Sequence, residues 1–85
     1  MATFFLMDVF NIFGVGVVIV GQVKSGTIRP GMKLNLAGKT MEIKTMELKR
    51  MQLKEAQEGE NLAISLAHGD YKLLRNYKNK HIEFY

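Results

Sequence analysis

An apolar segment interrupted by closely spaced glycines is the feature that most limits how this chain can fold. Residues 10–34 read FNIFGVGVVIVGQVKSGTIRPGMKL and carry glycine at positions 14, 16, 21, 26 and 31. Glycine is unfavourable inside a helix, whereas the valines and isoleucines between these glycines pack well on a pleated sheet. The segment therefore predicts strands joined by tight turns, with Gly21 relieving crowding or bending a strand inside a closed sheet.

A membrane helix is the first alternative for this part of the chain. The run from Ala2 to Val23 is long enough to span a bilayer and carries a single charge. Asp8, Asn11 and three glycines would make such a helix costly, and no basic residue precedes it as a signal peptide requires. We therefore expect no membrane association.

A phosphate-binding loop is the second alternative. Gly14 and Gly16 begin a dinucleotide-binding pattern, but Ile19 stands where the third glycine is needed and no helix follows to hold a pyrophosphate. The triplet Gly38-Lys39-Thr40 lacks the earlier glycine of a nucleotide-hydrolysing loop. We expect no nucleotide hydrolysis and no cofactor.

Alternating apolar residues and turn signals predict short strands along the rest of the chain. The predicted strands are residues 4–13, 17–24, 32–36, 41–49 and 61–67, with a closing strand around Ile82 and Phe84. Residues 41–58 are rich in helix formers, but their apolar positions alternate in two blocks with a phase slip at Thr45, which indicates a strand with a β-bulge. We expect a loop or short turn at 52–58 and an irregular segment after His68.

Composition limits the function classes. Eighty-five residues form one small domain, 1–85, and the absence of cysteine excludes disulfides, thiolate zinc sites and cysteine nucleophiles. A chain without cysteine is typical of the reducing cytoplasm. Twelve Lys and Arg against eight Asp and Glu give a net charge of +4, which favours polyanionic partners.

The ordered set of these motifs resembles a known domain. The stretch FNIFGVGVVIVGQVKSGTIRPGMKLNL, followed by IKTMEL and EAQEGENLAISL, is similar to the second domain of elongation factor Tu and of related translational GTPases. The resemblance covers about residues 7–67, and the tail 68–85 departs from it. It implies an all-β fold, a small closed antiparallel β-barrel, and favours a strand at 41–49.

The resemblance also implies a binding pocket. In elongation factor Tu this domain helps to receive the aminoacylated end of transfer RNA, whose terminal adenine enters a pocket on the barrel. The matching positions here are Met7, Ile12, Gly14, Val18, Arg50 and Ser65. Met7 replaces a carboxylate of the family and Ser65 replaces an aliphatic residue. From the residues alone, the barrel core is the favoured place for Ile12 and Val18, and a turn for Gly14.

Basic residues interleaved with aromatic ones suggest an RNA-binding face, because cations neutralise phosphates and rings stack on unpaired bases. The candidate RNA-binding residues are Lys49, Arg50, Tyr71, Lys72, Arg75, Tyr77, Lys78 and Lys80. The alternatives remain open: Arg50 is a solvated surface residue, and the tail covers one end of the barrel through Leu73 and Leu74.

Enzyme and metal sites are not expected. Ser65, His68 and Asp70 are close in sequence, but a triad needs a base placed on a nucleophile, which sequence proximity does not supply. His68 and His81 lack a clear third ligand for a metal ion. We predict no catalytic residues and no metal.

The predicted function is therefore a non-catalytic barrel that binds transfer RNA or ribosomal RNA, or the ribosome, through a basic face. The alternative is a protein-interaction or adaptor module, with Phe4, Phe5 and Met7 exposed to a partner. In a variant of this alternative, the chain associates with itself through an unpaired edge of its N-terminal strand.

Overall fold

Seven strands and one short helix make up the computed structural model, which describes residues 1–85. The elements are β1 (Ala2–Ile12), β2 (Gly16–Ser25), β3 (Lys33–Leu36), β4 (Lys39–Leu48), β5 (Met51–Gln52), β6 (Asn61–Ala67), α1 (Tyr71–Arg75) and β7 (Lys80–Phe84). All paired strands are antiparallel, in the order β3-β4-β6-β2-β1-β7, and β5 pairs with β4. The predicted all-β fold class is confirmed.

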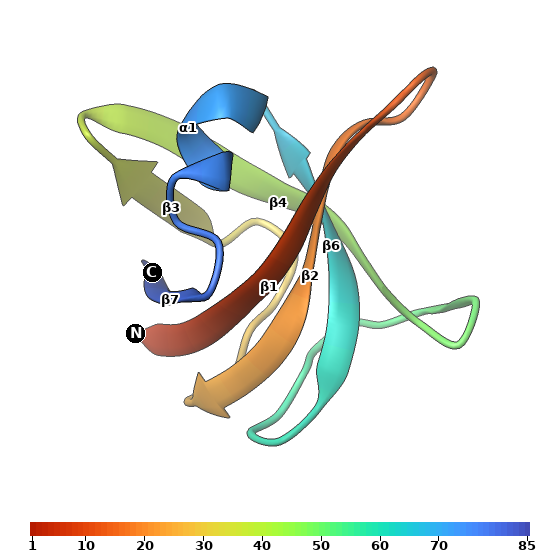
Figure 1. The fold of residues 1–85 in the computed structure, drawn as a ribbon. Coiled ribbons are helices and arrows are strands. Elements are labelled where there is room, and N and C mark those ends of the chain that lie inside the picture. The colour runs from red at the N-terminus through yellow and green to blue at the C-terminus, as the bar shows by residue number, and fades with distance from the viewer.

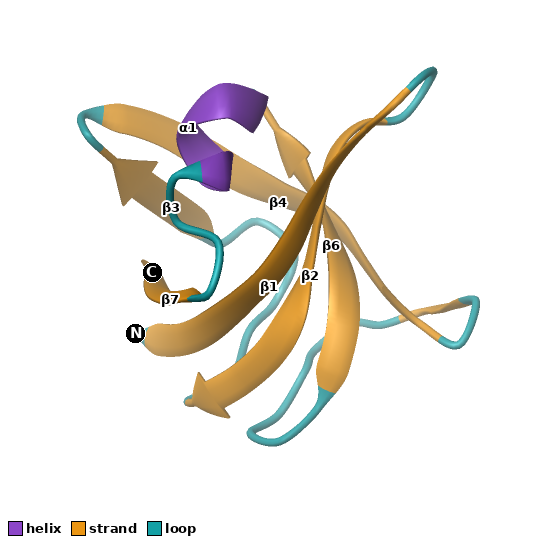
Figure 2. Cartoon of the chain, viewed as in Figure 1, coloured by secondary structure: helices purple, strands orange, loops and turns teal.

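The two ends of this sheet meet and close it into a barrel. The N–H of Lys33 in β3 donates to the carbonyl of Tyr85 at 2.7 Å, and the N–H of Tyr85 donates to the carbonyl of Lys33 at 2.9 Å. Figure 1 shows the resulting curved sheet, and Figure 2 shows how loops join the strands at the barrel ends. The predicted closing strand is thus present as β7.

The barrel interior is filled by inward-facing side chains from every long strand. Twenty buried hydrophobic residues form one cluster, and no polar side chain is buried. One inner row, set by the strand register, consists of Val9, Ile19, Ile64 and Met46. Alternation along the strands, interrupted by the bulges in β1 and β4, places one set of side chains inside the barrel and the other on its outer surface.

Strand β4 settles the conflict between propensity and pattern at residues 41–49. It is a strand, and its pairing with β6 shifts between Ile43 and Thr45, so the bulge falls on Lys44, beside the predicted phase slip. The predicted loop at 52–58 begins at Gln52, the last residue of the two-residue strand β5, and includes one isolated bridge, in which Ala56 pairs with Ile28. Burial of an apolar face outweighed helix propensity here.

The N-terminal strand differs from prediction in two ways. Phe4 is fully buried, with its ring centroid 6.0 Å from that of Phe84, and Phe5 is half-buried, so only Met7 of the predicted exposed set is exposed. Over Thr3–Leu6, β1 pairs with both β2 and β7. The predicted unpaired edge is therefore wrong for this part of the strand.

The tail contains a short helix that the sequence analysis did not predict. Asp70 caps α1 by accepting a hydrogen bond from the N–H of Leu73 at 3.1 Å, and its carboxylate also pairs with Lys39 at 2.6 Å. Leu74 is fully buried and Leu73 packs against the core, which confirms that the tail covers the barrel through these leucines. The helix is too short and too polar to cross a membrane, and no other helix is present.

Gly21 lies where two strands and a core side chain meet. A Cβ atom added at Gly21 would overlap the carbonyl oxygen of Phe5 and lie 2.7 Å from the ring of Phe4. The predicted role of Gly21 in relieving crowding is confirmed, because only a residue without a side chain fits there.

We predict that Gly21→Ala destabilises the barrel by about 3 kcal/mol, since neither the Phe5 backbone nor the Phe4 ring has room to move in a filled core. Gly59→Ala is the matched control, because Gly59 has a positive φ of 93° but open space around it. Its cost is about 1 kcal/mol from backbone strain alone. Urea unfolding of both variants checks this, and equal losses would show that crowding at Gly21 is unimportant.

The ion pair between Asp70, which caps α1, and Lys39 predicts that the stability of the fold depends on pH. Lys39 first, and then the N–H of Leu73, hold the pKa of the Asp70 carboxyl below its usual range. A lowered pKa in the folded state stabilises the fold above the unfolded pKa, and this stabilisation is lost as pH falls through the folded pKa, below about pH 4.

Asp70→Asn should therefore lower Tm by a few degrees at neutral pH, and the difference from the wild type should shrink as pH falls below about 4. Glu83→Gln, which removes an exposed carboxylate, is the control and should leave Tm unchanged. Thermal melts across the pH range provide the measurement. A constant difference between wild type and Asp70→Asn at all pH values would contradict the role of this carboxylate.

Candidate nucleic-acid interface

The outward-facing side chains of four adjacent strands form the surface nearest to the predicted pocket. Strand register places Val18 of β2 opposite Phe10 of β1 and Ser65 of β6, and places Ser65 opposite Thr45 of β4. Phe10 is 44% exposed, although it is a large apolar residue. This row contains no charged residue.

A hollow of about 290 Å³ lies on this surface, and we name it the outer pocket. Seven residues line it: Ile12, Val15, Val18, Thr45, Glu47, Ala63 and Ser65. The small side chains of Ala63 and Ser65 leave space between larger neighbours on β2 and β4. The pocket therefore combines an apolar wall with one carboxylate and two hydroxyl groups.

Three of the six pocket residues suggested by the resemblance line this hollow, namely Ile12, Val18 and Ser65. The placement of Ile12 and Val18 in the barrel core, which the residues alone favoured, is wrong. Ile12 is 44% exposed at the end of β1 and Val18 is half-buried on the outer face. Val18 points outward from β2, whereas its neighbours Val17 and Ile19 point into the core.

The other three do not line the pocket. Met7 is exposed at the bulge of β1, between Leu6 and Asp8. Gly14 occupies the turn of the β1–β2 hairpin with a φ of 81°, as the turn interpretation predicted. Arg50 lies in the β4–β5 turn, three residues after Glu47 of the pocket.

The β4–β5 turn presents two cations to solvent. Lys49 and Arg50 have φ values of 50° and 66°, both in the left-handed region, and both side chains are exposed. Neither forms an ion pair. Their charges are therefore available to a ligand that approaches the end of the outer pocket beside Glu47.

The cations of the tail lie elsewhere. Figure 1 shows α1 on the side of the barrel opposite to the green β4–β5 turn, so the predicted basic residues form two separate groups. In the tail group, Arg75 lies over the Tyr71 ring at 5.6 Å, and Lys80 lies over the Tyr77 ring at 5.9 Å. The tyrosine faces are thus partly covered by cations of the chain itself.

Lys78 of the same group pairs with Asp8 of β1 at 3.4 Å. The N–H of Val9 chiefly, and then Lys78, hold the pKa of the Asp8 carboxyl below its usual range. Asp8 is therefore ionised at neutral pH and cancels part of the positive charge beside α1.

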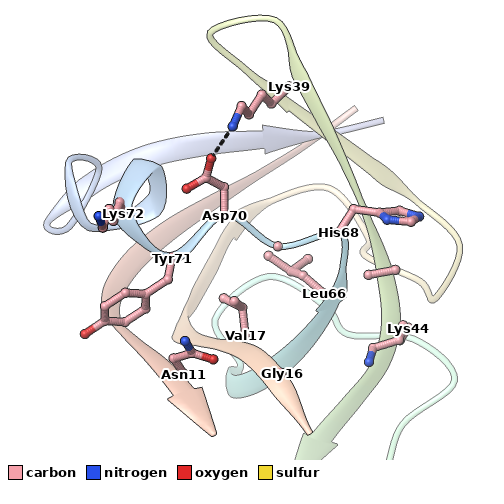
Figure 3. A pocket seen from close by; sticks show the side chains of 12 residues that line it. Asn11, Gly16, Val17, Lys39, Lys44, Leu66, His68, Asp70, Tyr71 and Lys72 are labelled. Atoms are coloured by element: carbon pink, nitrogen blue, oxygen red, sulfur yellow. Dashed lines mark hydrogen bonds and ion pairs between the residues drawn. The ribbon is translucent and has the colours of Figure 1, made fainter.

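The residues considered for a triad are not arranged as one. The Asp70 carboxylate is bonded to Lys39 and to the N–H of Leu73, and Figure 3 shows the His68 ring directed away from it. No three side chains of His, Asp or Glu come together as a metal site would need.

Sequence reasoning missed four lining residues of the outer pocket: Val15, Thr45, Glu47 and Ala63. Alternation alone places Thr45 and Glu47 on the outer face of their strand. Only the register of β4 against β6, with its bulge, shows that Thr45 lies opposite Ser65 and that Glu47 lies opposite Ala63.

Comparisons with known proteins agree with this geometry. A family model described as "Elongation factor Tu domain 2" matches residues 16–75. Elongation factor 1-alpha from Eremothecium gossypii and from Blastobotrys adeninivorans are each 39% identical over 72 residues, which cover 82% of this chain. The matched region spans only 16% of the length of these relatives.

Solved structures share the fold. The translation elongation factor SelB from Methanococcus maripaludis, in its apo form, superimposes with a TM-score of 0.78 at 20% identity, covering 95% of this chain and 18% of that one. A bacterial selenocysteine-specific elongation factor EF-Sec gives a TM-score of 0.75 at 25% identity, covering 98% of this chain and 14% of that one. Since the family model matches most of the barrel, the chain belongs to the elongation factor Tu domain 2 family.

Proposed function

We propose that this barrel binds RNA in translation, with an unpaired RNA end in the outer pocket and Arg50 beside it. The observation that supports this proposal is the meeting of Ile12, Val18 and Ser65 in one hollow. All three residues are among the pocket positions that the family resemblance implies, and they come from three different strands. The role is one of binding in the cytoplasm, and the barrel itself supplies no catalysis.

The chemistry of the outer pocket suits a base and its ribose better than a phosphate. Ile12, Val15 and Val18 offer an apolar surface on which a base can pack. The Glu47 carboxylate accepts hydrogen bonds from an exocyclic amine or a ribose hydroxyl and repels a phosphate. Arg50, outside the pocket, is then placed to pair with the phosphate that precedes the bound nucleotide.

A protein-interaction role is the second candidate, and one observation favours it. The tip of the β1–β2 hairpin extends away from the barrel in Figure 1 and is apolar. Phe13 is fully exposed and Val15 is 48% exposed. Exposed apolar groups of this size often mark partner surfaces.

The proposed function is tested with a short single-stranded RNA that ends in adenosine and is labelled at its 5′ end. In an anisotropy titration, Arg50→Ala should weaken binding about tenfold and reduce the salt dependence, because a phosphate contact is lost. Val18→Glu should abolish end binding, since it places a second carboxylate in the pocket near Glu47. Lys33→Ala, on β3 away from the pocket, is the control and should bind like the wild type.

A wild-type chain that does not bind this RNA at low salt would refute the proposed function. Phe13→Ser distinguishes the RNA-binding role from the protein-interaction role, because Phe13 lies at the exposed hairpin tip and does not line the outer pocket. If Phe13→Ser releases a co-purifying protein and no variant changes RNA affinity, the adaptor role is the better account.

A further inference from the structure

The largest hollow of the molecule lies at one end of the barrel and is separate from the outer pocket. Its volume is about 800 Å³, and we name it the end groove. Figure 3 shows it between α1, the β1–β2 hairpin and β4. Its polar and charged lining residues are Asn11, Lys39, Lys44, His68, Asp70, Tyr71 and Lys72.

The base of the groove is held by tight packing of the loop after β6 against β2. A Cβ atom added at Gly69 would lie only 2.6 Å from Cβ of Val17. Val17 and Leu66, which also line the groove, are buried in the core. The base is therefore tightly packed, whereas the lysines around it are exposed.

The charge of the lining is positive. Three lysines face one aspartate, and Asp70 is already paired with Lys39 at 2.6 Å. Lys44 donates to the carbonyl of Val15 at 3.2 Å and has no carboxylate partner, and Lys72 forms no ion pair. Figure 3 shows Lys44 on β4 and Lys72 on α1 at opposite sides of the groove. Two ammonium groups without a carboxylate partner thus lie across a shared hollow.

We propose that the end groove binds the phosphodiester backbone of single-stranded RNA, as a second contact beside the outer pocket. This inference rests on the proposed function and extends it. The two hollows adjoin at β4, where Lys44 lines the groove and the next residue, Thr45, lines the pocket. Lys44 also bonds to the carbonyl of Val15, whose side chain lines the pocket. One strand of RNA can therefore contact both hollows.

A polymer fits the groove better than a small anion. A small ligand is normally oriented by several convergent, partly buried polar groups. Here the lysines and His68 are exposed, and no polar side chain of the chain is buried. Exposed cations on both sides of an open groove instead match a chain of phosphates, which they contact without reading sequence. Asn11 and Tyr71 at the groove add a hydrogen-bonding amide and an aromatic ring.

The test compares two doubly substituted chains that lose the same charge. Lys44→Gln/Lys72→Gln removes the free cations of the groove, and Lys24→Gln/Lys33→Gln removes two exposed lysines outside both hollows. The probes are single-stranded RNAs of about twelve nucleotides and different sequence, titrated by anisotropy across a salt series. Thermal melts establish that both variants are folded.

Lys44→Gln/Lys72→Gln, the groove variant, should weaken RNA binding about tenfold for every sequence. It should also reduce the slope of log affinity against log salt concentration by about 1.4, as expected for two lost phosphate contacts on a single strand. The control variant should change affinity less than about twofold. Lys44→Arg/Lys72→Arg keeps both charges and should bind like the wild type.

The other outcomes separate the two proposals. If the wild type binds RNA and the groove and control variants weaken it equally, the end groove is not a binding site, although the proposed function stands. If the wild type binds no RNA, both proposals fail. If polyglutamate competes as well as RNA at equal charge, the groove does not recognise an RNA backbone and the assignment is wrong.

Discussion

The pairing of Lys33 with Tyr85 is the contact on which the rest of the structure depends. Two backbone hydrogen bonds, of 2.7 and 2.9 Å, join Lys33 of β3, the first strand of the sheet order, to Tyr85, the residue that follows β7, the last strand. Without them β3 and β7 would be open edges and the core would face solvent on one side. Closure fixes the tilt and stagger of all strands, and hence the positions of the outward-facing side chains that form both hollows.

Much of this fold could be predicted from the sequence because turn chemistry and alternation act locally. The glycine-rich turns, the strand pattern and the slip near Thr45 each depend on a few neighbouring residues. Helix α1 was missed because its stability comes from contacts distant in sequence: Asp70 pairs with Lys39 of β4, and Leu74 enters the core. Five residues are too few for helix propensity to give a signal.

The candidate site was predictable only in part, for a related reason. Resemblance supplied Ile12, Val18 and Ser65, but not Glu47 or Lys44, since cross-strand neighbours depend on register and on the bulge. Charge counting also could not reveal that Asp70 pairs with Lys39, or that α1 and the β4–β5 turn lie on opposite sides. The net charge of +4 is therefore spread over several surfaces of the barrel.

We propose that the outer pocket and the end groove form one RNA-binding surface, in which the pocket holds a terminal base and the groove contacts phosphates. Amide chemical shifts of the isotope-labelled chain, followed by NMR during titration with single-stranded RNA ending in adenosine, test this most directly. We expect saturable shifts at Val18, Ser65 and Thr45 and at Lys44, with little change at Lys24. Shifts confined to the barrel end around Lys24, or no shifts at all, would contradict the account.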